Sequence, residues 1–312
     1  MPQIITCTPN PALDLSTSTD KFIPEEKLRC AKPLREPGGG GINVARALKR
    51  LCCDATAIFP SGGPTGEMYE SLLAKEKIDQ HPLKVKSATR ESIMITDKEH
   101  NDLYRFILPG GELEEREWQM LLDLVNDYAD ADYLIASGSL PPGAPENFYA
   151  RLSRKAREHN VRFILDTSGT ALCKITEAGA FLLKPNKNEL AALVGRKLTN
   201  ESDWKNAAEE VINKYDIEVL VVSLGGEGAI LATSRNIEKL AAPQVEKQSS
   251  VGAGDSMVAG IVSKLIEGME IREAVRYGLC CGSAAIMTPG SELLHKKDAD
   301  ELFEKIRSEN PD

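Results

Sequence analysis

A glycine turn that runs directly into an apolar helix is the feature of this sequence best suited to chemistry. Gly252, Ala253 and Gly254 precede the apolar stretch 257–265, and Asp255 lies between them. Because the first N–H groups of a helix have no partner within it, such a turn stabilises an anion. A carboxylate beside it can take a proton from a hydroxyl while charge builds on a transferring phosphoryl group. The alternative is that Asp255 simply caps the helix.

The glycine run at residues 38–41 is a second turn that leads into an amphipathic helix. Glycine admits positive φ angles and the close approach of a ligand to the backbone, and Asn43 adds an amide at the start of the helix. The spacing fits neither the dinucleotide-binding fingerprint nor the Walker A loop, which ends in Gly-Lys-Ser or Gly-Lys-Thr. We therefore predict a built ligand site here, the alternative being a flexible turn.

Lys184, Asn186 and Glu189 form a compact polar motif directly after the apolar run 181–183. Asn186 and Glu189 are three residues apart, so their oxygens lie on one side of a helical turn. That pairing suits magnesium, which keeps several waters and takes one or two protein groups. The same spacing is typical of a helix capping box, and the two interpretations are compatible.

A third glycine turn follows the apolar strand predicted at 219–222, with Ser223 at its start. Its glycines, at positions 225, 226 and 228, leave backbone groups that can pack against a nucleotide. A hairpin turn is the plain alternative, and this segment alone does not separate the two.

Several charged residues lie in stretches that lack helical signals, namely Asp14, Lys27, Arg29, Arg90 and Arg105. The chain is acidic overall, with 38 basic and 47 acidic residues and a net charge of −9. Cations on segments that cover one cleft are typical of phosphate capture, although a single one is more often a solvated surface charge. The acidic balance argues against non-specific binding to nucleic acid or to an anionic membrane.

The seven cysteines include no Cys-x-x-Cys pair and no cluster with histidine at zinc spacing. An odd number favours reduced thiols in a reducing compartment. No stretch is long and apolar enough for a membrane span, and the first residues lack the basic-then-apolar pattern of a signal peptide. We expect a cytoplasmic protein.

Short β-branched runs alternate with amphipathic helical windows along most of the 312 residues. Such alternation predicts an α/β domain whose mostly parallel sheet is covered by helices on both faces. Ligands bind beyond the carboxyl ends of the strands in such sheets. The polar motifs at 137–139, 166, 184–186 and 223–226 all follow predicted strands, so we expect them at one edge of the sheet.

Two segments interrupt this alternation, at about 13–36 and 81–108, and period-two patterning at 92–96 and 103–107 predicts strands there. We expect one domain spanning residues 1–312, in which these segments form a small discontinuous β-sheet, a lid over the site. A sheet of that size cannot bury much apolar surface alone. Pairing with a second subunit through the lid, as a homodimer, is therefore predicted.

The glycine motifs, in this order, resemble the signatures of the PfkB family of ribokinase-like sugar kinases. The matching stretches are GGGGINVAR at 38–46 and VGAGDS at 251–256, and the resemblance extends from about residue 5 to residue 294. It implies a ribokinase-like three-layer sandwich that uses ATP and magnesium. The opening TPNPALD at 8–14 is similar to the branch that acts on sugar phosphates. The all-glycine run is similar to the minor bacterial 6-phosphofructokinase type, since related kinases usually have Gly-Gly-Lys-Gly.

That resemblance implies phosphoryl transfer from ATP to the C1 hydroxyl of fructose 6-phosphate, a step of glycolysis. Asp255 would be the base, and the amides of Gly252, Ala253 and Gly254 the anion hole. Phosphorylation of tagatose 6-phosphate or fructose 1-phosphate stays open, as does a sugar-phosphate sensor without catalysis. A nicotinamide dehydrogenase is disfavoured by the glycine spacing.

The resemblance also implies binding residues. For the sugar hydroxyls these are Asp14, Gly39, Gly40, Asn43 and Ser139. For the 6-phosphate they are Lys27, Arg90 and Arg105. For the nucleotide they are Lys184, Asn186, Ser223, Gly225, Gly226 and Gly228, with Asn186 and Glu189 holding magnesium partly through water.

A monovalent cation, potassium, is implied behind the anion hole. Its ligands would come from Ser249, Val251, Ala285, Thr288 and Gly290. The chain departs from the family pattern here, because Pro289 alters the loop and Glu292 is acidic where a basic or neutral residue is expected. The ligands after Ala285 therefore stay open.

Overall fold

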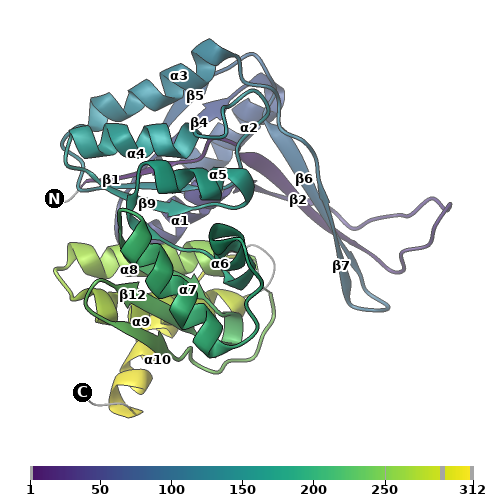
Figure 1. Ribbon diagram of the computed structural model, residues 1–312. Helices are drawn as coiled ribbons and strands as arrows, with labels where there is room; N and C mark the ends of the chain where they lie inside the picture. Colours follow the sequence, from purple (N-terminus) through teal and green to yellow (C-terminus); the bar gives the residue numbers. More distant parts are fainter. Residues whose placement is uncertain (1–2, 250, 289–291, 310–312) are drawn as a thin grey trace.

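Within residues 3–249, 251–288 and 292–309, which the computed structural model describes, nine strands form the central sheet (Figure 1). Their order is β13-β12-β11-β10-β9-β8-β1-β4-β5. In chain order the strands are β1 (Ile4–Cys7), β4 (Thr56–Ser61), β5 (Asp79–Lys84), β8 (Tyr133–Ser137), β9 (Arg162–Asp166), β10 (Ala180–Leu183), β11 (Ile217–Ser223), β12 (Ala229–Thr233) and β13 (Ile237–Leu240). The strands from β11 to β5 pair in parallel, whereas β12 and β13 are antiparallel. The predicted mostly parallel sheet is confirmed.

Successive residues of a central strand enter opposite faces of this sheet. On β1, Ile4 packs into the core on one face and Ile5 into the core on the other. On β11, Leu220 and Val221 divide in the same way. All four are buried, because a parallel strand between two helical layers has no solvent face.

Helices cover both faces, giving three layers (Figure 1). One face carries α1 (Gly40–Arg50), α2 (Gly63–Lys75), α8 (Ala253–Ile266), α9 (Ile271–Ile286) and α10 (Lys296–Glu309). The other carries α3 (Glu115–Asp123), α4 (Phe148–Glu158), α5 (Gly169–Lys174), α6 (Lys187–Val194) and α7 (Glu201–Lys214). Among the helices of the described residues, none has both the length and the apolar character needed to cross a bilayer.

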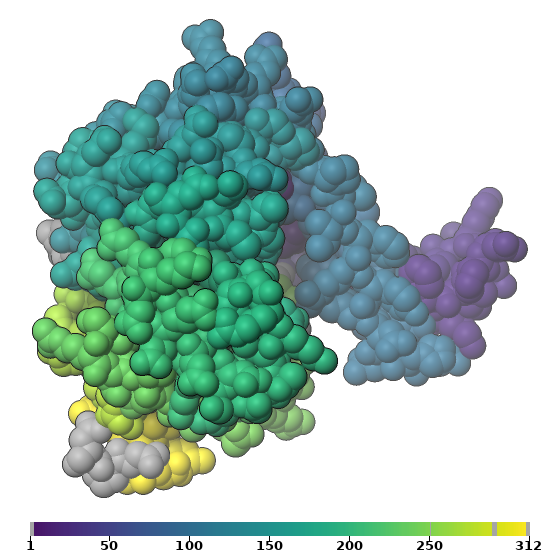
Figure 2. Space-filling view, viewed as in Figure 1, coloured from purple at the N-terminus to yellow at the C-terminus, as the bar shows by residue number. Residues whose placement is uncertain are grey.

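Among the described residues, four further strands form a smaller sheet, here called the lid sheet, in the order β3-β2-β6-β7. They are β2 (Ala12–Thr19), β3 (Leu34–Gly38), β6 (Arg90–Asp97) and β7 (Asp102–Ile107). Figure 2 shows this sheet standing out from the rest of the molecule. All of β7 is exposed, and its apolar side chains are Leu103, Tyr104, Phe106 and Ile107. The predicted separate sheet is present, and its apolar surface is open in the single chain.

The second of the two segments that form the lid sheet begins later in the chain than predicted. Residues 79–84 form β5, which pairs with β4 at the edge of the central sheet. The second lid segment therefore starts at Arg90, and the predicted boundary near residue 81 is wrong. The reason is the long-range pairing of β5 with β4, in which Thr56 faces Asp79. Short-range patterning does not reveal such a pairing.

Candidate active site

The first turn of α8 holds the carboxylate predicted to act as a base. Gly252 caps the helix with a φ of 72°, in the left-handed region. Oδ2 of Asp255 accepts a hydrogen bond from Nδ2 of Asn43 at 3.0 Å, and its Oδ1 accepts from the Ser137 hydroxyl at 3.5 Å. The starts of α1 and α8 and the end of β8 therefore meet at one carboxylate, and glycine, not Asp255, occupies the cap position.

The environment of Asp255 changes its acidity. Burial raises its pKa from 3.8 to about 7, and the negative charge of Asp166 acts in the same direction. The hydrogen bond from Asn43 and the charge of Lys184 oppose the rise. A general base works best when its pKa lies near the operating pH, so this carboxylate is suited to proton transfer.

The glycine run brings backbone close to the same carboxylate. Gly39 caps α1 with a φ of 115°, which favours glycine. A Cβ on Gly40 would lie 2.1 Å from the Oγ of Ser137, and one on Gly38 would lie 2.0 Å from Oδ2 of Asp14. A side chain at either position would displace a polar group of the site, which supports a built element over a flexible turn.

Asp166 and Lys184 form an ion pair beside the first turn of α8. Nζ of Lys184 lies 3.0 Å from Oδ2 of Asp166, and the side chains are 7% and 18% exposed. A Cβ on Gly254 would lie 3.3 Å from that Nζ, so the ammonium group borders the turn. Burial lowers the pKa of Lys184, but the charge and hydrogen bond of Asp166, together with the charges of Asp255 and Glu189, outweigh burial, and the pKa is raised. The sequence predicts that Asp166 lies at this edge of the sheet but assigns it no role, because its ion pair with Lys184 depends on the pairing of β9 with β10.

A pocket of about 350 Å³ opens between the turn after β11 and the start of α8. Four predicted nucleotide residues line it, namely Ser223, Gly225, Gly226 and Gly228. Ala253 and Gly254 border the same pocket, so it is continuous with the first turn of α8. The turn also joins the antiparallel strands β11 and β12, so the hairpin is confirmed and is compatible with the nucleotide interpretation. The volume is typical of a small-molecule site.

Asn186 and Glu189 form the predicted capping box at the start of α6. Oδ1 of Asn186 accepts from the N–H of Glu189 at 3.0 Å, and Oε2 of Glu189 accepts from the N–H of Asn186 at 2.8 Å. Burial raises the pKa of Glu189, and the charge of Asp166 adds to the rise. Two carboxylates within electrostatic reach fit a magnesium ion that keeps most of its waters. In the described part of the chain, no group of three or more His, Cys, Asp or Glu residues gathers as a metal site.

Carbonyl oxygens converge on Thr288 after the end of α9. Its hydroxyl lies within hydrogen-bond reach of the carbonyl oxygens of Ala285, Glu292 and Leu293. A hydroxyl has one hydrogen to donate, so most of these oxygens receive none from it. Hard cations prefer oxygen ligands, and the cluster fits the potassium ion implied by the sequence.

The segment before α8 lies against the same helix end. The N–H of Ser249 donates to the carbonyl of Ile286 at 3.1 Å, and the Ser249 hydroxyl accepts from the N–H of Val251 at 3.2 Å. The predicted ligands Ser249 and Val251 are thus brought next to the end of α9. Gly290 lies outside the described residues.

The lid sheet contributes polar groups next to the glycine run. Burial raises the pKa of Asp14 to about 6, whereas the charges of Arg90 and Arg105 lower it, so both arginines lie within electrostatic range of this carboxylate. Arg90 donates to the carbonyl of Asn10 at 3.3 Å, and its Nε is buried with no partner among the described residues. Asn10 in turn donates to the hydroxyl of Ser139 at 3.1 Å. These groups surround one region suited to a sugar phosphate.

Lys27 is not brought to this region within one chain. It is exposed in the segment 20–33 between β2 and β3, which projects away from the central sheet at the tip of the lid sheet (Figure 1). The predicted phosphate contact of Lys27 is therefore wrong for the single chain. The sequence pattern predicts that Lys27 lies in the lid, but it does not predict the direction in which the segment 20–33 projects.

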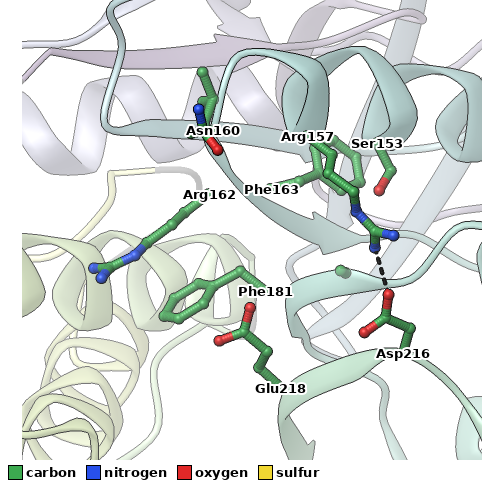
Figure 3. A pocket seen from close by; sticks show the side chains of 10 residues that line it. Ser153, Arg157, Asn160, Arg162, Phe163, Phe181, Asp216 and Glu218 are labelled. Atoms are coloured by element: carbon green, nitrogen blue, oxygen red, sulfur yellow. Dashed lines mark ion pairs between the residues drawn. The ribbon is translucent and has the colours of Figure 1, made fainter.

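A smaller cavity, of about 190 Å³, lies at the opposite edge of the sheet, near the starts of β9, β10 and β11 (Figure 3). Its arginines already have partners. Arg157 pairs with Asp216 at 2.8 Å. Arg162 lies over the ring of Phe181 at 5.1 Å and donates to the hydroxyl of Tyr133 at 2.8 Å. We therefore assign the candidate active site to the carboxyl edge.

A carboxylate of raised pKa at a helix N-terminus, next to a nucleotide-sized pocket at the carboxyl edge of a parallel sheet, is the arrangement expected of a phosphotransferase. Comparison with known proteins specifies the class. The chain belongs to the pfkB family of carbohydrate kinases, whose model matches residues 10–297. Its fold is ribokinase-like, as the resemblance implies.

Named relatives share almost the whole chain. ATP-dependent 6-phosphofructokinase isozyme 2 of Escherichia coli (strain K12) is 42% identical over 304 residues, 97% of this chain and 98% of that protein. A crystal structure of phosphofructokinase-2 from Escherichia coli in complex with potassium has a TM-score of 0.93 at 41% identity, covering 98% of this chain and 99% of the other. A structure of that protein in complex with fructose-6-phosphate has a TM-score of 0.91 at 41% identity, with the same coverage.

Proposed function

We propose that this protein transfers the γ-phosphoryl group of ATP to the C1 hydroxyl of fructose 6-phosphate, giving fructose 1,6-bisphosphate. The observation that carries the proposal is Asp255, with a pKa of about 7, in the first turn of α8. The Escherichia coli relatives, one of them crystallised with fructose-6-phosphate, support the choice of acceptor. The protein is thus a 6-phosphofructokinase that acts in glycolysis.

The transfer is an in-line displacement without a covalent enzyme intermediate. The C1 oxygen of the sugar forms a bond to the γ-phosphorus, the bond to the bridging β–γ oxygen breaks, and ADP leaves. Asp255 takes the hydroxyl proton as the oxygen attacks. The N–H groups of Gly252, Ala253 and Gly254, at the positive end of α8, stabilise charge on the γ-phosphoryl oxygens.

Lys184 adds a fixed positive charge at the border of the anion hole, and Asp166 holds it there. Asn186 and Glu189, with Asp166 nearby, would hold magnesium, which when bound neutralises charge on the ATP phosphates. The turn from Ser223 through Gly225, Gly226 and Gly228 would contact the nucleotide in the pocket that it lines. Potassium would be held by oxygens of Ser249, Val251, Ala285 and Thr288.

The acceptor would bind between the glycine run and the lid sheet. We assign its hydroxyls to Asp14, Gly39, Gly40, Asn43 and Ser139. We assign its 6-phosphate to Arg90 and Arg105, two arginines of the lid sheet whose charges act on Asp14. Closure of the lid sheet over this region would exclude water, which otherwise competes as acceptor.

An acceptor panel tests the proposed function. The purified protein is given ATP and magnesium with fructose 6-phosphate, tagatose 6-phosphate or fructose 1-phosphate, each with and without potassium. We expect the highest kcat/KM with fructose 6-phosphate and a faster rate with potassium. A higher value for another sugar would assign the protein to that acceptor. Binding of sugar phosphate without consumption of ATP would mark a sensor.

We further propose a homodimer through the lid sheet. Ile107, on β7, is 71% exposed among other exposed apolar side chains, and such a patch is typical of an interaction surface. We expect wild type to sediment as a dimer and Ile107→Asp to shift it toward monomer. Met120→Asp, at an exposed apolar position on α3, is the matched control. A monomeric wild type with full activity would contradict the proposal.

The cysteines indicate where the protein works. All seven are free thiols, three of them buried. Free thiols are typical of reducing compartments, and we infer a cytoplasmic location.

A further inference from the structure

Arg50, the last residue of α1, is anchored on backbone outside its own helix. Its Nη1 donates to the carbonyl oxygen of Leu293 at 3.1 Å and reaches that of Leu294 at 3.5 Å. The two leucines are 1% and 0% exposed. The guanidinium therefore holds the backbone of Leu293 and Leu294, which lie between α9 and α10.

Arg50 also lies within electrostatic range of the acidic residue at position 292. Burial lowers the pKa of Arg50, and the negative charge of Glu292 is among the charges that oppose this change. Glu292 also lies 3.6 Å from Nε2 of His295. The family pattern leads us to expect a basic or neutral residue at position 292. Glu292, which is acidic, lies instead within range of the positive charge of Arg50 on α1.

The segment that Arg50 holds supports the anion-hole turn. A Cβ on Gly252 would lie 2.3 Å from Cδ2 of Leu293, so the Leu293 side chain packs directly against the glycine that caps α8. Interiors are close-packed, and a shift of Leu293 would therefore be transmitted to this turn and to the N–H groups that follow it.

The same segment completes the oxygen cluster at Thr288. The carbonyl of Leu293 lies 3.4 Å from the Thr288 hydroxyl while it accepts from Arg50. The carbonyl of Glu292 contacts that hydroxyl as well. One guanidinium thus holds backbone shared by the anion-hole turn and by the candidate potassium site.

Helix α1 contacts the catalytic region at both of its ends. Asn43 and Arg50 are seven residues apart, which is two helical turns and places them on one side of the helix. Asn43 binds the carboxylate of Asp255, and Arg50 binds the segment beneath Gly252. The helix therefore braces α8 at its base-bearing turn and at its cap.

We propose that Arg50 is a positioning residue for phosphoryl transfer, which holds Leu293 against Gly252 so that the anion hole keeps its geometry. The inference rests on the proposed function for the reaction whose rate it concerns. An interaction that acts only in the transition state changes kcat and leaves KM nearly unchanged. Small misplacements of the reacting groups cost up to about a hundredfold in rate.

The test compares Arg50→Met and Arg50→Lys with wild type, and uses Arg235→Met, an exposed arginine in the turn after β12, as the matched control. Two quantities are measured for each protein. The first is kcat and KM with ATP and fructose 6-phosphate. The second, which does not depend on turnover, is the potassium concentration that gives half of the potassium-induced rise in Tm.

For Arg50→Met we expect kcat to fall about 10- to 100-fold with KM within about twofold of wild type, and the half-maximal potassium concentration to rise. Arg50→Lys keeps a hydrogen-bond donor, so its kcat and potassium midpoint should lie between those of wild type and Arg50→Met. It serves as the test if Arg50→Met fails to fold. If kcat and the potassium midpoint of Arg50→Met match those of Arg235→Met, the inference is overturned. If wild type fails to phosphorylate fructose 6-phosphate, the proposed function fails, and the potassium midpoints still decide the role of Arg50.

Discussion

At the amino edge of the central sheet charged side chains pair at the surface, whereas at the carboxyl edge they are partly buried around one carboxylate. Arg157 and Asp216 at the amino edge are 57% and 71% exposed (Figure 3). Lys184 and Asp166 at the carboxyl edge are 7% and 18% exposed. Both edges contain an ion pair of similar length, so the pair itself does not distinguish them.

The difference lies in what the pair does to its surroundings. Asp166 and Lys184 act in opposite directions on the pKa of Asp255, together with burial and the hydrogen bond from Asn43. Charges act strongly on one another where water is scarce and weakly where it screens them. We infer that burial next to a helix start suits the carboxyl edge for chemistry, and we expect substitutions at the two edges to have different consequences.

Apart from the base itself, the largest effect is expected at Lys184. Lys184→Met removes the cation that borders the anion hole, and we expect kcat to fall about 100- to 1,000-fold. Removing one partner of a buried pair also costs about 3–5 kcal/mol, so Tm should fall.

Steady-state kinetics and thermal unfolding check this prediction, with Lys197→Met, an exposed lysine in the loop after α6, as control. The double variant Lys184→Met with Asp166→Asn separates the two effects, because it leaves no unpaired charge. It should recover stability without recovering turnover. Recovery of both would show that Lys184 matters for folding alone.

The next effect concerns pH. Asp255 must be deprotonated to accept a proton, and its pKa is about 7, so kcat/KM should rise as the pH increases to about 7 and level off above it. Asn43→Ala removes the donor that lowers this pKa, so the midpoint should move to higher pH. Profiles of kcat/KM between about pH 5 and 9, the range in which perturbed carboxylates titrate, measure the wild-type midpoint and its shift in Asn43→Ala.

Asp216→Asn, at the amino edge, is the control for these profiles and should leave the midpoint unchanged. A wild-type profile that is flat across neutral pH would contradict the assignment of Asp255. An unchanged midpoint in Asn43→Ala would show that its contact with the carboxylate has no electrostatic role.

The smallest effect is expected at Arg157. Its pair with Asp216 is largely exposed, and such pairs contribute about 0–1 kcal/mol. Arg157→Met should lower Tm slightly, in part because the side chain also donates to the carbonyl of Ala178, and it should leave kcat and KM unchanged. A clear loss of kcat would mean that the amino edge communicates with the active site, and the contrast between the edges would fail.

Local signals made much of the fold predictable, including the helix start that carries Asp255. The glycine turn and the apolar run after it place α8 at 253–266, and the alternation of strands and helices predicts the mostly parallel sheet. Asn186 and Glu189 form the capping box that their spacing indicates.

What depends on long-range pairing was not predictable. Strand β5 exists because residues 79–84 pair with β4, and no short-range pattern reveals this. The role of Asp166 becomes visible only when β9 and β10 pair and bring its carboxylate to Lys184. The direction of the lid tip, which carries Lys27 away from the site, likewise follows from how the lid sheet joins the core.

The central claim is that Asp255 receives the proton of the attacking hydroxyl at the mouth of the α8 amides. Single-turnover transfer from ATP to fructose 6-phosphate by Asp255→Asn, at pH 8, tests it most directly, with ATP affinity measured on the same protein. The account predicts a rate lower by at least about a hundredfold, with ATP still bound. A rate near that of wild type would contradict it.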